Sequence, residues 1–212
     1  MSPQKTTKEP MESDIDFEER YQSGNTPWEI HRPDQSLMDF IENCGLAPCR
    51  VLDIGCGTGS NLIWLASRNF QATGYDLSAL AIKTARQKAA ASGADCTFVQ
   101  GDFLADELAA NSFDFVFDRG CFHHFRDPDS RLAFAAKVAH VLSEEGIWLS
   151  LIGNRDDTRE GPGPPKLSAL EITSAVEPFF KIIALTAHHF DFDHTGPPAL
   201  NWICQLKKRP IP

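Results

Sequence analysis

The chain has 212 residues, of which 42% are hydrophobic and 23% charged, as is ordinary for a globular domain. Its formal net charge is −9, and Lys207–Arg209 is the main basic block, so we expect no nucleic-acid partner. No apolar run approaches the roughly 20 residues that a membrane helix needs, and the polar N-terminal stretch has no signal-peptide core. Six cysteines without a C-x-x-C pair are typical of a reducing compartment. We therefore predict a cytoplasmic protein without membrane contact, either a monomer or a homodimer.

The N-terminal part of the chain is expected to lie outside the main domain. Residues 1–13 are polar and are predicted to form a disordered tail. Residues 14–45 are predicted to form a helical lid, with a short helix near 17–21 and a second helix from about Asp34 to Asn43. Asp34 is a suitable N-cap for the second helix, and Gly45 is a suitable stop.

The most informative segment is a strand followed by a glycine-rich turn and a helix. Val51–Ile54, which includes Asp53, has the apolar character of a buried parallel strand. The turn that follows places glycines at alternate positions around Cys56 and Thr58, and a helix is predicted over 60–66. Glycines let a ligand lie against the backbone, and the helix N-terminus directs free N–H groups toward it. This unit predicts a nucleotide-like cofactor, bound with the help of Gly55, Gly57 and Gly59.

The next two strands end in residues that suit the rest of such a cofactor. The strand over 70–75 is followed by Asp76, which can accept hydrogen bonds from both hydroxyls of a ribose, and then by Leu77. The strand over 96–100 is followed by Gly101 and then by Asp102 and Phe103, an acid and an aromatic suited to holding an adenine. Three successive strand ends therefore carry groups that a cofactor needs.

Alternating strands and helices continue through most of the chain. Helices are predicted over 79–91, 130–142 and 167–176, and strands over 113–118, 147–152, 181–186 and 200–206. This pattern predicts a doubly wound α/β fold, with a mostly parallel sheet and helices on both faces. The stretch 153–166 is rich in glycine, proline and charge, and it is predicted to be a mobile loop.

Four motifs together give a specific resemblance. The series VLDIGCGTGS, GYDLS, QGDF and FDFVFDRG, spread over residues 50–152, resembles the motifs of class I S-adenosylmethionine-dependent methyltransferases. The resemblance implies a seven-stranded Rossmann-like sheet with an antiparallel C-terminal strand, formed by residues 46–212. It also implies S-adenosylmethionine as cofactor, held by Trp28, Asp53, Gly55, Cys56, Gly57, Gly59, Asp76, Leu77, Asp102, Phe103 and Asp118.

A short segment before the core narrows the resemblance. Thr26–Pro33 is similar to the Pro-Trp segment of thiopurine, thiol, halide and tellurite methyltransferases, and Asp118–Gly120 is similar to that subgroup as well. In those enzymes the segment folds over the methionine end of the cofactor, which implies that role for Trp28. The alternative is that Trp28 is a packing anchor.

Candidate catalytic residues follow the fourth strand, at the sheet edge where open α/β folds bind ligands. They are Arg119, His123 and His124. Adjacent histidines point in different directions, so at most one is expected to face the acceptor, and a structural role for both is an equal alternative. The predicted function is methyl transfer to a small molecule, with a thiol or other soft nucleophile as acceptor. The alternatives are an O- or N-methyltransferase with a histidine as base, and a cofactor-binding partner subunit without catalysis.

The stretch His188–His194 contains histidines and aspartates that could suggest a metal site. Metal ligands must converge on one point, whereas a straight strand separates alternate residues by about 6.6 Å. We therefore predict no metal here, but a strand end and loop near the acceptor pocket.

Overall fold

The computed structural model describes residues 16–160, 163–193 and 196–210. Its strands, in chain order, are β1 (Arg50–Ile54), β2 (Gln71–Asp76), β3 (Cys96–Gln100), β4 (Phe113–Arg119), β5 (Leu142–Gly153), β6 (Phe180–His189) and β7 (Leu200–Lys208). They form one seven-stranded sheet in the order β3-β2-β1-β4-β5-β7-β6. The strands from β3 to β5 are mutually parallel, and β7 runs antiparallel to both β5 and β6. The predicted fold class is therefore confirmed.

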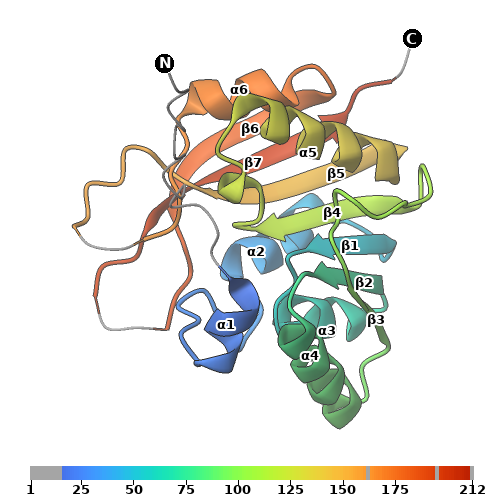
Figure 1. Cartoon of the computed structure of the whole chain (residues 1–212). Coiled ribbons are helices and arrows are strands. Elements are labelled where there is room, and N and C mark those ends of the chain that lie inside the picture. Colours follow the sequence, from blue (N-terminus) through green and yellow to red (C-terminus); the bar gives the residue numbers. More distant parts are fainter. Residues whose placement is uncertain (1–15, 161–162, 194–195, 211–212) are drawn as a thin grey trace, which may run out of the picture.

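Helices cover both faces of this sheet (Figure 1). They are α1 (Phe17–Gln22), α2 (Gln35–Cys44), α3 (Ser60–Ala66), α4 (Ala79–Ser92), α5 (Pro128–Val141) and α6 (Ala169–Val176), with a 3-10 turn η1 (Phe122–His124). One core cluster joins α5 and α6 to the sheet through residues such as Phe134, Ile172 and Trp148. A second cluster joins α2, α3 and α4 to the opposite face through residues such as Leu37, Leu62 and Ile82.

Several helix ends form where the sequence predicts them. The Asp34 side chain accepts a hydrogen bond from the backbone N–H of Ser36 and caps α2, which ends at Gly45 with φ 58°. Ser78 caps α4 in the same way. These boundaries follow local rules, because a short polar side chain satisfies a free N–H and glycine tolerates the left-handed region.

Other predicted boundaries are wrong by a few residues. Helix α5 begins at Pro128, before the predicted Ser130, because Asp127 caps it and proline fits the first helical turn. Strand β5 begins at Leu142, well before the predicted Ile147, because Leu142 pairs with Phe113 of β4. Boundaries that depend on a partner strand are not visible in the local pattern.

The segments that connect these elements gather at the carboxyl edge of the parallel strands. In Figure 1, α1 and the long loops after β5 and β6 all lie at this end of the sheet. The predicted tail, residues 1–13, lies outside the described residues, and the mobility of 153–166 stays a prediction. Among the described residues, no helix is long and apolar enough to cross a membrane.

Candidate functional site

The glycine turn lies directly against the end of β2. Gly55, Gly57 and Gly59 have φ values of 72°, 53° and 79°, a region that residues with a Cβ rarely adopt. The backbone N–H groups of Gly55 and Cys56 both donate to the Tyr75 carbonyl, at 2.8 and 3.0 Å. The turn therefore has a fixed shape that requires glycine.

Asp76 closes the same turn from β2. One carboxylate oxygen accepts from the Gly57 N–H and the other from the Ser78 N–H, each at 2.8 Å. Burial raises the pKa of this carboxyl, and the two backbone hydrogen bonds oppose that shift. Each carboxylate oxygen can accept a further bond, so Asp76 retains capacity for ligand hydroxyls.

A cavity of about 1380 Å³ opens at this edge of the sheet. It exceeds the ~300–1,000 Å³ of common ligand pockets and has room for two small molecules. Most predicted site residues line it, namely Trp28, Gly55, Cys56, Gly57, Gly59, Asp76, Leu77, Asp102, Phe103, Arg119, His123 and His124. The sequence thus identified residues from five separate segments that share one cavity.

Two predicted cofactor residues, Asp53 and Asp118, are absent from this lining. Asp118 is fully buried, and its oxygens accept from the backbone N–H groups of Cys121 and Phe122 and from the Trp148 indole. Burial raises its pKa to about 6. These bonds hold the turn that carries the two histidines. Asp118 is thus placed to shape that wall of the cavity.

Asp53 has a different environment. Its side chain is buried, and one carboxylate oxygen has no hydrogen-bond partner among the described residues. Burial, followed by the nearby charge of Asp118, raises its pKa well above the usual value. A buried acceptor without a donor is costly, so this oxygen fits a ligand-supplied or water-mediated donor.

The N-terminal segment, residues 17–34, covers the glycine turn through contacts that the sequence did not predict. The Glu29 carboxylate accepts from the backbone N–H of Thr58 at 3.2 Å and from its hydroxyl at 2.5 Å. Tyr21 donates its hydroxyl to Glu29 and accepts from the Trp28 indole, both at 3.1 Å. An acid in the TPWEIHRP motif was the available signal, because carboxylates are favoured at helix N-termini.

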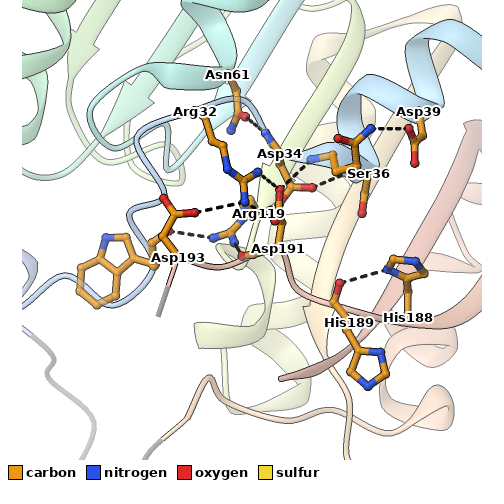
Figure 2. Close-up of polar contacts among 12 residues, drawn as sticks. Arg32, Asp34, Ser36, Asp39, Asn61, Arg119, His188, His189, Asp191 and Asp193 are labelled. Carbon is orange, nitrogen blue, oxygen red and sulfur yellow. Dashed lines mark hydrogen bonds and ion pairs between the residues drawn. The ribbon is translucent and has the colours of Figure 1, made fainter. Parts of the chain in front are cut away.

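Arg119 connects three parts of the chain (Figure 2). Its Nε donates to the Asp34 carboxylate at 2.6 Å, and its Nη1 donates to the Trp28 carbonyl at 2.9 Å. Its Nη2 donates to the backbone carbonyl of Asp191. The Arg119 side chain is 12% exposed and that of Asp34 is 0% exposed, so this ion pair is buried. Arg119 therefore joins β4 to the N-terminal segment and to the loop after β6.

The two histidines have distinct environments. His123 is buried, and its Nδ1 accepts from the Gly153 backbone N–H at 2.9 Å. A neutral ring that accepts at Nδ1 carries its proton on Nε2. His124 packs edge-on against Phe17 at 5.1 Å, and no hydrogen bond to its ring is found within the described residues. Burial, with a smaller contribution from the nearby charge of Arg126, lowers its pKa to about 4.

The His188–His194 stretch begins in β6, which ends at His189. Phe190, Asp191 and Phe192 then line the cavity, as predicted for a strand end and loop near the pocket. The Asp191 carboxylate pairs with Arg32 in a bidentate arrangement (Figure 2). His194 lies outside the described residues, and no group of potential metal ligands converges within the described part of the chain.

Comparisons with known proteins agree with this geometry. Residues 51–146 match a family model described as a methyltransferase domain. A probable thiol methyltransferase 2 of Arabidopsis thaliana is 28% identical over 172 residues, which cover 80% of this chain and 75% of that protein. An uncharacterized methyltransferase of Schizosaccharomyces pombe is 31% identical over 110 residues, which cover 51% of this chain and 75% of that protein.

A solved structure described as "Conversion of a Disulfide Bond into a Thioacetal Group during Echinomycin Biosynthesis" has the same fold. It superimposes with a TM-score of 0.74 at 25% identity, covering 86% of this chain and 85% of that one. The fold, the cavity and the relatives define a methyltransferase. The chain belongs to the class I S-adenosylmethionine-dependent methyltransferase family, and it is similar to thiol methyltransferases within it.

Proposed function

We propose that this protein transfers the methyl group of S-adenosylmethionine to the sulfur of a small thiol. The observation that carries the proposal is that one cavity is bounded by the glycine turn and strand-end acids on one side. On its other side it is bounded by aromatic rings, neutral histidines and arginines. When bound, the cofactor supplies an electrophilic methyl group on its sulfonium. The protein then has to hold both molecules in line and exclude water.

The cofactor side of the cavity suits that task. Asp76 would hold the ribose hydroxyls, because its carboxylate lines the cavity and can accept further hydrogen bonds. Asp102 and Phe103 would flank the adenine at the end of β3. One carboxylate oxygen of Asp53 has no partner among the described residues. It suits a water that also contacts the cofactor, or the ammonium group of the cofactor itself. Trp28, fixed by its indole bond to Tyr21, would cover the site.

The acceptor side favours a nucleophile that needs little help with its proton. His123 cannot accept a proton on Nε2 when its Nδ1 is engaged by Gly153, so we assign it a positioning role. Arg119 is held by Asp34 and two carbonyls, and we assign it a positioning role as well. A thiol ionises near neutral pH without a strong base, whereas an alcohol does not. The names of two similar proteins, one a thiol methyltransferase and one tied to a disulfide-to-thioacetal conversion, also concern sulfur.

Two measurements test this proposal. Calorimetry should show binding of S-adenosylmethionine, and Asp76→Ala should weaken it. Turnover should then be measured with benzenethiol, phenol and aniline, which share one ring and differ in the nucleophile. We expect methylation of the thiol and little of the other two. Absence of cofactor binding, or equal turnover of phenol and thiol, would refute the proposal.

A second candidate function is O-methylation with His124 as general base. The observation in its favour is that His124 lines the cavity and is neutral at pH 7, because burial lowers its pKa to about 4. A positioned base contributes about 10²–10⁴-fold, so His124→Phe would reduce phenol turnover to that extent. Thiolate turnover should be far less affected. The His124→Phe comparison across benzenethiol and phenol therefore separates the two candidate functions.

A further inference from the structure

Five arginines line the cavity, and their partners differ. Four of them already bind other groups of the protein. Arg20 donates to Asn25, Arg32 pairs with Asp191 and Asp193, Arg119 pairs with Asp34, and Arg159 pairs with Asp157. The fifth, Arg126, has no hydrogen bond or ion pair from its guanidinium among the described residues.

The backbone that carries Arg126 is nevertheless fixed. Arg131 of α5, which is buried, donates to the carbonyls of Phe125 and Arg126, at 3.1 and 2.5 Å. The segment follows directly after η1, so Arg126 stands beside His124 on the same wall of the cavity. An exposed cation that has no partner among the described residues, on a backbone that Arg131 holds in place, is suited to bind a ligand anion.

The position of Arg126 separates it from the cofactor groups. Strands β1, β2 and β3 carry the glycine turn, Asp76 and Asp102, whereas Arg126 follows β4. In the sheet order, β4 lies on the far side of β1 from β2 and β3, toward β5. Asp76 and Asp102 thus lie on the cofactor side, Asp191 after β6 is paired with Arg32, and Arg126 lies on the acceptor side.

We propose that Arg126 binds a negatively charged group of the acceptor, distinct from the reacting sulfur, and so selects thiols that carry an anion. A series of aromatic rings leads from this cation to the cofactor side, because Phe125, next to Arg126, packs on Phe134, and Phe134 packs on Phe103. The acceptor therefore has an apolar body with a thiol at one end and an anion at the other. This inference rests on the proposed function for the thiol, but the anion site can be tested separately.

The test compares 3-sulfanylbenzoate with benzenethiol, which differ by one carboxylate. The value measured is the ratio of kcat/KM for the two thiols in the parent protein, in Arg126→Glu and in Arg126→Lys. We expect Arg126→Glu to lower this ratio by about tenfold or more, mainly through KM, because a hydrogen-bonded charge pair is replaced by repulsion. Arg126→Lys keeps the charge and should retain part of the preference.

A matched control separates a local effect from a change in net charge. Arg68→Glu changes the net charge equally at a side chain that pairs with Glu42 and does not line the cavity. Its ratio should stay within about twofold of the parent, as for ordinary surface substitutions. An unchanged ratio in Arg126→Glu, or an equal fall in Arg68→Glu, would overturn the inference.

A binding measurement covers the case in which the parent methylates neither thiol. That result would refute the proposed function, and calorimetry with 3-(methylsulfanyl)benzoate in the presence of S-adenosylhomocysteine would then decide on Arg126. Tighter binding to the parent than to Arg126→Glu supports the anion site. Equal binding to both, or no binding to the parent, contradicts it.

Discussion

Removing the charge of Arg119 should destabilise the N-terminal segment more than it should affect any chemical step. In Arg119→Met the Asp34 carboxylate stays buried but loses its ion-pair partner, while its capping bond to Ser36 at 2.8 Å remains. Breaking a buried pair by removing one partner costs about 3–5 kcal/mol. Because Arg119 keeps 12% exposure, we expect about 3 kcal/mol, the low end of that range.

The assay is urea unfolding combined with hydrogen exchange. The free energy of unfolding should fall by about 3 kcal/mol, unless the N-terminal segment opens on its own and limits the global loss. In that case the amides of residues 17–34 should lose protection while the rest of the chain keeps it. Asp34→Asn, which keeps the cap, should remove most of the penalty when it is combined with Arg119→Met.

A neighbouring arginine provides the control. Arg32 also pairs with an aspartate in this cluster, but its side chain is 43% exposed (Figure 2). Arg32→Met should therefore cost no more than about 1 kcal/mol. One result would refute the idea that the buried Arg119–Asp34 pair holds the N-terminal segment in place. It is that Arg119→Met changes the unfolding free energy as little as Arg32→Met does and leaves exchange at 17–34 unaltered. A large loss of turnover in that variant would instead favour a role for Arg119 at the acceptor.

Three further predictions concern the turn, the ribose site and pH. Gly57→Val should abolish cofactor binding by calorimetry in a folded protein, because a Cβ would lie 2.6 Å from a Glu29 carboxylate oxygen and 2.8 Å from the Tyr21 hydroxyl. Asp76→Ala should weaken cofactor binding by about 1.5–3 kcal/mol, and unchanged affinity would contradict the ribose assignment. The pKa of His124 lies below that of an unfolded histidine, so its contribution to stability is present above about pH 6.5 and is lost as pH falls toward 4. Between pH 7 and 5 the parent should lose about 2 kcal/mol more unfolding free energy than His124→Phe, and parallel pH curves would exclude this effect.

The placement of the glycine turn and the strand-end acids at one cavity could be predicted because the signals for it are local. The glycines, Asp76 and Asp102 each sit at the end of a strand, and parallel strands bring their carboxyl ends to one edge. Ser78 and Asp34 cap helices by bonds to residues two or three positions away. No knowledge of the distant chain is needed for these assignments.

The contacts that Arg119 makes could not be predicted in the same way. Arg119 contacts residues that lie 72 to 91 positions away along the chain, and nothing in the sequence near it identifies them. Asp118 shows a different limit. It ends a strand as Asp76 does, but successive side chains point to opposite faces, so Asp118 turns toward Trp148 while Arg119 turns toward α2. A correct strand end therefore does not settle which of two adjacent side chains enters the site.

The contacts of the N-terminal segment also determine where it should open. At the N-terminal end of the segment, α1 has no buried residue. The Glu18 carboxylate attaches α1 to the start of α4, because it accepts from the Ser78 hydroxyl and the Leu80 N–H. At its C-terminal end, next to α2, the segment is held by the buried pair of Arg119 and Asp34. Exposed contacts open at lower free energy than buried ones, so α1 should separate first and the chain near Asp34 should act as the hinge. Amides of α1 should then exchange faster than those of residues 28–34, and binding of S-adenosylhomocysteine should slow exchange in α1 most. Uniform exchange across residues 17–34 would mean that the segment opens as one unit.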